Sequence, residues 1–239
     1  MNSSAGFRRG FGRWPRKLWC VGRLAGIFAL GGAMPGSHAA LLPPSIFQKD
    51  FKPDNVFVYP PKLSLDFRRV VVLPLATASV DGDLADGCEA LTPVLWEQLV
   101  KSRKFEVVSA APEKLRRRTG QAAWTGNEVL PPDFLAFLRR EYACDGVLFA
   151  ELTTYHGYAP LAVGWRFKLV DAHTGQIIWA ADEVFDAARP SVAKAAHHFE
   201  KRQAKADADA ATGSWLVLNS PRRFGGYSAA ALLDTLPDR

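Results

Sequence analysis

The sequence predicts a single α/β domain built on a mixed β-sheet with helices packed against it. In the first half, short apolar runs rich in β-branched residues alternate with amphipathic segments, as in parallel strands joined by helices. The segment 161–186 instead contains two alternating strands around a glycine-containing turn, which is typical of an antiparallel meander. With 239 residues, 48% of them hydrophobic, the chain is long enough to bury one sizeable core.

Strands and helices are expected in a definite order along the chain. The expected strands cover 70–75, 105–108, 147–153, 161–170 and 177–184. The expected helices cover 86–102, 112–118, 133–143, 190–211 and 227–236. This order places the parallel part of the sheet first and the antiparallel part last.

The first strand and the first helix begin the parallel part. The run 70–75 is continuously apolar, as in a strand buried on both faces, and Pro74 ends its backbone pairing. The following helix places leucines four residues apart on one side. Pro93 lies inside this stretch, and because proline is favoured at the first helical position, a start near Thr92 is an alternative to a start near Asp86.

The next elements carry turn and capping signals. The strand 105–108 is followed by a basic helix that Gly120 terminates. A polar loop over 119–132 contains Trp124. Asp133 is the expected N-cap of the next helix, which buries phenylalanine and leucine side chains.

The antiparallel part follows from strict alternation of side chains. Between 161 and 170 large apolar residues alternate with Arg166 and Lys168, which predicts a strand with one exposed face. Gly175 provides the positive φ that a hairpin turn over 171–175 requires. After the hairpin, residues 190–211 are rich in Ala, Lys and Asp and only weakly amphipathic, so an exposed helix or arm is expected there.

The first 39 residues have the three parts of a secretory signal. A basic region ends at Arg23, an apolar run follows, and the small residues Ser37 and Ala39 precede an expected cleavage before Ala40. The apolar run is about half as long as a membrane-spanning helix needs to be. An uncleaved anchor, and export by the twin-arginine route through the arginine pair at 8–9, are the alternatives.

The net charge of +6 belongs to this leader. All six charged residues of the leader are Lys or Arg, so the chain's 30 Lys+Arg and 24 Asp+Glu leave 24 of each sign after it. A nucleic-acid binder carries its positive charge on the folded body, because neutralisation of phosphates supplies most of its affinity. Nucleic-acid binding is therefore not expected.

The three cysteines bear on lipid attachment and on disulfide formation. Lipidation is not expected, because the only leader cysteine, Cys20, precedes the apolar run instead of following the cleavage point. Two alternatives stay open for Cys88 and Cys144, namely a disulfide, which an oxidising periplasm permits, or two buried thiols.

The sequence contains no recognisable catalytic, cofactor or metal motif. It has no G-x-S-x-G elbow, no Walker-type loop and no G-x-G-x-x-G run. His197 and His198, with Glu200, are interpreted as a solvated helix face, because zinc sites favour histidines four residues apart on a helix. Glu151 and His156 form the one conceivable acid–base pair and carry the alternative function of a periplasmic hydrolase. The expectation is a protein without enzymatic activity, cofactor or metal.

Aromatic and basic side chains outside the predicted core are the candidates for partner binding. Exposed aromatic rings contribute a large contact area to protein interfaces, and a cluster of arginines suits an acidic partner. The candidate residues are Trp124, Tyr155, Tyr158, Arg116, Arg117 and Arg118.

Four segments in order, 69–75, 105–108, 143–148 and 169–179, resemble a group of bacterial envelope domains. The group comprises the periplasmic domain of the curli-secretion protein CsgG, the N-terminal domain of TolB and the LpoB-type activators of penicillin-binding proteins. The most specific piece is D-x-x-T-G over 171–175, followed by an apolar strand. The resemblance implies a mixed sheet covered by helices and a non-catalytic interaction module, with no catalytic residues to carry over.

The resemblance and the leader together define the expected organisation. It consists of a signal peptide over 1–39, a Pro-rich extended arm over 40–66, the α/β domain over 67–186 and a helical C-terminal extension over 187–239 that packs on the domain. The expected function is to bind an envelope protein, in the periplasm or at the outer membrane, without a transmembrane span in the mature chain. A secretion-channel-associated subunit is a further alternative, although 186–214 lacks the alternating hairpins of a pore.

Overall fold

The computed structural model describes residues 51–78, 82–206 and 216–238. The predicted signal peptide and its cleavage site lie outside the described residues. The strands are β1 (Val56–Val58), β2 (Arg69–Val72), β3 (Ala76–Thr77), β4 (Glu106–Ser109), β5 (Gly146–His156), β6 (Ala162–Asp171) and β7 (Ile177–Asp186). The helices are α1 (Asp83–Ser102), α2 (Pro112–Thr119), α3 (Phe134–Tyr142), α4 (Pro190–Ala206) and α5 (Pro221–Leu233), with a short 3-10 helix, η1 (Leu216–Asn219).

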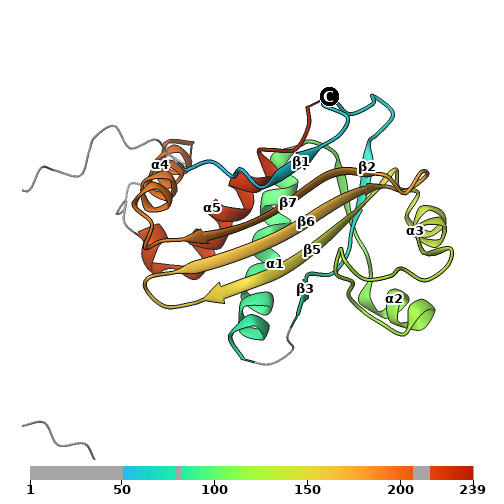
Figure 1. The fold of residues 1–239 in the computed structure, drawn as a ribbon, viewed down its shortest axis with the longest axis horizontal. Helices are drawn as coiled ribbons and strands as arrows, with labels where there is room; N and C mark the ends of the chain where they lie inside the picture. Colours follow the sequence, from blue (N-terminus) through green and yellow to red (C-terminus); the bar gives the residue numbers. More distant parts are fainter. Residues whose placement is uncertain (1–50, 79–81, 207–215, 239) are drawn as a thin grey trace, which may run out of the picture. The chain divides into compact units, whose positions relative to one another are not determined.

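The strands form one mixed sheet in the order β1-β7-β6-β5-β2-β4, with β3 paired to β5 (Figure 1). β2 lies parallel to both β4 and β5, whereas β5, β6, β7 and β1 pair antiparallel. The parallel part precedes the antiparallel meander in the chain, apart from β1. The predicted fold class, a mixed α/β sheet covered by helices, is confirmed.

The two faces of the sheet are packed by different helices. α1, α4 and α5 bury their apolar sides against one face and form the larger core cluster, and α2 and α3 cover part of the other face. β2 contributes side chains to the clusters on both faces of the sheet. Val70 and Val72 belong to the first cluster and Val71 belongs to the second. Successive side chains of a strand point to opposite faces, so a continuously apolar run is needed at this position.

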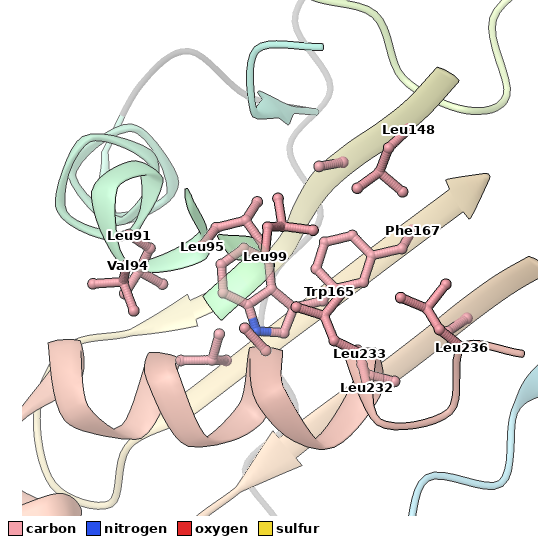
Figure 2. Close-up of a cluster of buried hydrophobic side chains, with 14 of the residues drawn as sticks. Leu91, Val94, Leu95, Leu99, Leu148, Trp165, Phe167, Leu232, Leu233 and Leu236 are labelled. Carbon is pink, nitrogen blue, oxygen red and sulfur yellow. The ribbon is translucent and has the colours of Figure 1, made fainter. Parts of the chain in front are cut away.

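The centre of the larger cluster is the indole of Trp165 on β6. Figure 2 shows this ring between Leu95 and Leu99 of α1 and the leucines at the end of α5. Its Nε1 donates a hydrogen bond to Ser228 Oγ of α5 at 2.8 Å, and that hydroxyl donates to the carbonyl of Gly225 at 3.0 Å. The one polar atom of the buried ring is therefore satisfied, as a buried N–H group requires.

α1 begins at Asp83, so Pro93 lies inside the helix and a start near Thr92 is wrong. Proline removes one backbone donor from the helix, which leaves the carbonyl of Glu89 without its usual partner. Pro93 lies on the exposed side of α1, where water can solvate this carbonyl. The buried side of α1 extends back towards Leu84, which packs against the core, and this burial supports the first turns despite the proline.

Two helix termini differ from their predicted form. Asp133 has a left-handed backbone (φ 60°) and makes no side-chain cap, and its carbonyl accepts from the Phe137 N–H at 2.8 Å. α5 begins at Pro221, six residues before the predicted start, because Ser220 is an N-cap whose Oγ accepts from the Arg223 N–H at 3.4 Å. Proline at the first helical position favours this start.

α4 packs more closely than its composition indicates. Val192, Ala195 and Ala196 recur at helical spacing and are buried in the larger cluster. Small side chains let the helix approach the body closely, so an exposed helix or arm is the wrong description of residues 190–206.

The outermost strand on one side, β1, lies in the segment predicted as an extended arm. Val56–Val58 pair with β7, and the N–H of Tyr59 continues the pairing by donating to the Ile178 carbonyl at 2.8 Å. Further along, the Leu63 N–H donates to the Asp238 carbonyl at 2.8 Å. The residues before β2 are thus held by β7 and by the last described residues of the chain.

The β6–β7 hairpin has the predicted form. Arg166 and Lys168 alternate with buried Trp165, Phe167 and Leu169. In the turn, Asp171 Oδ1 accepts from two successive backbone N–H groups at 2.7 and 2.8 Å, and Gly175 has the positive φ of 74° that the turn requires.

Candidate functional site

The turn between β5 and β6, residues 157–161, presents Tyr158 to solvent. Tyr158 is 77% exposed, whereas Leu161, which ends the turn, is buried. His156 Nδ1 lies 2.9 Å from the Pro160 carbonyl oxygen. The imidazole and the Tyr158 ring pack edge to face, with ring centroids 6.4 Å apart. We call residues 155–161 the hairpin tip. It holds a large aromatic ring at the end of two long paired strands.

Tyr155 anchors the hairpin tip to the body of the molecule. Its ring lies directly over Gly87 of α1, where an added Cβ would come within 2.4 Å of Tyr155 Cγ. Partial burial of the phenol raises the pKa of Tyr155, with the nearby carboxylates of Asp86 and Asp83 adding to the effect. Of the two predicted tyrosines, Tyr158 is therefore available for contact and Tyr155 is its support.

Trp124 is buried, in contrast to the exposure expected from its polar loop. Only 6% of the residue is exposed, and its ring packs against Phe134 of α3 with centroids 5.3 Å apart. The loop folds back over the sheet because Lys168 Nζ on β6 donates to the Gly126 carbonyl. Trp124 closes the second core cluster and does not offer its ring to a partner.

The three arginines of α2 are exposed and lie far from the hairpin tip. Arg116 Nη1 pairs with Glu113 at 2.8 Å, and the Arg118 guanidinium lies 5.9 Å from the centre of the Phe137 ring. In Figure 1, α2 lies near the start of β5 and the hairpin tip lies at the other end of this strand. The structure therefore does not bring Arg117 and its neighbours together with Tyr158 in one surface.

Glu151 belongs to a charge cluster across three strands. It is 5% exposed and lies opposite Arg166, which in turn lies opposite Asp182. Arg166 Nε donates to Asp182 at 2.7 Å, and its Nη1 reaches Glu151 at 3.3 Å. The hydrogen bond that Arg166 donates to Asp182, with the charges of both carboxylates, raises the pKa of Arg166. The buried carboxylate is thus compensated by a fixed cation, as a buried charge requires.

The structure separates Glu151 from His156, the two residues of the hydrolase alternative. His156 is five residues further along β5 than Glu151, a distance of about 16 Å for an extended strand. Glu151 contacts Arg166, and His156 contacts the Pro160 carbonyl. Each group has its own partner in the fold, and the geometry does not join them as an acid–base pair.

Cys88 and Cys144 are both free thiols. Cys88 packs against the larger cluster and its Sγ lies 3.3 Å from the Leu75 carbonyl oxygen, whereas Cys144 is buried in the cluster on the other face. Burial raises the pKa of both thiols. Of the two alternatives that the sequence left open, the structure contains the unpaired thiols, with the sheet between them.

The histidine pair on α4 does not assemble a metal site with Glu200. The Glu200 carboxylate accepts from the Val217 N–H at 3.2 Å and from Arg223 Nη1 at 2.7 Å, so it links α4, η1 and α5. Within residues 51–78, 82–206 and 216–238, no group of three or more His, Cys, Asp or Glu side chains is placed to hold a metal ion. In the same residues, no helix is both long and apolar enough to cross a membrane.

No family model and no curated protein matches this sequence. Among solved structures, it is similar to the PelC dodecamer from Paraburkholderia phytofirmans, with 16% identity, a TM-score of 0.43, and coverage of 77% of this chain and 96% of that one. It is also similar to lipoprotein GNA1162 from Neisseria meningitidis (17% identity, TM-score 0.40, 58% and 99% covered). The LpoB C-terminal domain from Escherichia coli shows 20% identity and a TM-score of 0.33, with 49% and 82% covered. LpoB was named in the sequence resemblance, and assignment of this chain to any branch of that group stays a prediction.

Proposed function

We propose that this chain is an exported, non-catalytic interaction protein of the bacterial cell envelope that binds a protein partner through the hairpin tip. The proposal depends on one observation, the 77% exposed ring of Tyr158 at the end of the paired strands β5 and β6. The secretory pattern of the leader supports the compartment.

The hairpin tip is suited to protein binding because its aromatic ring is exposed and also contacts a neighbouring side chain. His156 contacts both the Pro160 carbonyl and the Tyr158 ring, and Tyr155 packs on α1. A ring that already has such a contact loses less conformational freedom on binding, so more of its contact area contributes to affinity. Truncating a central aromatic residue of an interface typically costs about 2 kcal/mol or more.

Site-specific photo-crosslinking in cells tests this proposal. A photoreactive phenylalanine analogue replaces Tyr158 in one strain and Val129 in another, since Val129 is 94% exposed but lies in the loop before α3. We expect position 158, and not position 129, to capture one envelope protein as a discrete adduct. Equal capture at both positions, or none at position 158 in a protein that complements a deletion strain, would refute binding through the hairpin tip.

The same proposal makes a prediction about Glu151. Glu151→Gln removes the charge and keeps the shape and an oxygen that accepts from Arg166, so the fold is expected to persist. If the protein acts by binding alone, this variant complements a deletion strain as well as wild type does. Loss of complementation with an unchanged melting temperature would favour the hydrolase alternative.

A further inference from the structure

A cavity of about 260 Å³ lies where α1, α4, η1 and α5 meet. We call it the α4 cavity. One wall is apolar and consists of Val94, Phe199 and Val217, and the remaining lining is polar or charged apart from Gly226. None of its lining residues belongs to β5, β6 or the hairpin tip.

A buried amide side chain lines this cavity. Gln98 of α1 is 9% exposed, and among the residues that the structure describes its side-chain amide has no hydrogen-bond partner. The amide nitrogen faces α5, since a Cβ added to Gly226 would lie 3.6 Å from Gln98 Nε2. The amide nitrogen and oxygen are not fully enclosed, so solvent in the cavity reaches them and a bound molecule can take its place. Gln98 therefore offers an unused amide to a polar occupant of the cavity.

The charges around the cavity indicate which polar groups this occupant carries. Both carboxylates are already engaged, Glu97 with Lys101 at 2.6 Å and Glu200 with Arg223 at 2.7 Å. Arg222 also lines the cavity and has no ion-pair partner among the described residues. Its guanidinium adds five N–H donors to the two of the Gln98 amide, so the unused hydrogen-bonding capacity of the lining consists mainly of donors. A ligand rich in acceptors, with negative charge, complements such a lining.

We propose that the α4 cavity binds a small organic anion, with a carboxylate held by Gln98 and Arg222 and an apolar part against Val94, Phe199 and Val217. The apolar wall distinguishes this ligand from an inorganic anion, which would leave the wall without a contact. The volume accommodates a molecule of a few carbon atoms.

Titration with butyrate, observed by NMR on the purified protein, tests the proposal. The side-chain amide resonances of Gln98 report contact directly, and inorganic phosphate and the neutral isostere butyramide are the comparison probes. We expect butyrate to shift these resonances with at least tenfold higher affinity than either comparison probe. The variant Arg222→Gln is expected to weaken butyrate binding at least tenfold, whereas the matched control Arg117→Gln on α2 leaves it unchanged.

Gln98→Leu provides a second readout that does not require a ligand. Leucine fills similar space without the amide, which only solvent contacts in the cavity, so we expect a melting temperature no lower than that of wild type in the absence of anions, together with at least tenfold weaker butyrate binding. A lower melting temperature would show that the Gln98 amide has a structural partner and would overturn the argument. Binding of phosphate as tight as that of butyrate, or no binding of any probe at about 10 mM, would also overturn the proposal.

Discussion

Trp124 is the largest side chain in the smaller core cluster. It packs against Phe134 of α3 under a loop that Lys168 ties to the sheet, and the cluster extends from there to Leu115 of α2 and Val147 of β5. The indole N–H is buried without a hydrogen-bond partner in the described part of the chain. Burial of the ring area therefore stabilises this side of the sheet, at the cost of one unpaired donor.

Replacing Trp124 with alanine is expected to destabilise the protein by about 3–5 kcal/mol, because the missing ring leaves a cavity in the smaller cluster. Trp124→Phe should cost much less, since it keeps most of the apolar area and removes the unpaired N–H. Urea denaturation followed by circular dichroism measures both, and Tyr158→Ala, at an exposed position, is the control with an unchanged midpoint. An unchanged midpoint for Trp124→Ala would contradict the packing described for Trp124.

Sequence reasoning identifies aromatic residues in loops but not their burial. Tyr158 and Trp124 occupy similar polar surroundings in the chain, and only one of them is exposed. The difference results from the contact between Lys168 and Gly126, which are 42 positions apart. The burial of Gln98 could not be predicted either. In the sequence it is one polar position of an amphipathic helix, and its burial depends on the packing of α4 and α5 around it.

Close contact between α1 and α5 positions much of the larger core. Gly225 of α5 lies against Leu91 of α1, so close that an added Cβ would come within 2.4 Å of Leu91 Cδ2. Leu91 is fully buried, so its side chain would have to repack within the core. At the next residue, Gly226, the nearest atoms to an added Cβ are at 3.5 and 3.6 Å, which is ordinary contact.

These neighbouring glycines provide a matched pair of substitutions. Gly225→Ala is expected to destabilise the protein by about 1–3 kcal/mol through overpacking, despite the better helix propensity of alanine. Gly226→Ala should be neutral or stabilising by up to about 1 kcal/mol, because it gains propensity without a clash. Thermal denaturation of the two variants measures the difference, and equal midpoints would show that the helices are further apart than described.

Elements with a strong local pattern were predicted well, and elements that depend on distant partners were not. The alternation of β6 and the glycine of its turn predicted the hairpin correctly. β1 has three residues among prolines, and it is a strand only because β7 lies beside it. Pro93 indicated a later start of α1 than the structure has. The burial that supports the first turns of this helix cannot be inferred from local sequence.

Charge is distributed unevenly over the whole molecule. The basic residues in excess lie in the first 39 positions, and residues 40–239 carry equal numbers of acidic and basic side chains. A protein body without net charge does not attract a partner by long-range steering. The excess charge is therefore proposed to serve export, and binding to depend on contacts at short range.

Export makes a direct prediction about the purified protein. Mature chain recovered from the native host is expected to begin at Ala40, to be released by osmotic shock and to remain unlabelled by radioactive palmitate. N-terminal sequencing and intact mass measure the first of these. Recovery of a chain that retains residues 1–39 would contradict the proposed signal peptide.

The affinity of the hairpin tip for the captured partner is the most direct test of the proposed function. Isothermal titration of the partner protein into wild type, Tyr158→Ala and the exposed control Val129→Ala is expected to show at least tenfold weaker binding for Tyr158→Ala alone, with melting temperatures unchanged. Arg117→Ala, and an increase in salt from about 0.05 to 0.5 M, should change the affinity little. Wild-type affinity of Tyr158→Ala together with a steep loss of binding in salt would instead assign the interface to the arginines of α2 and contradict the account.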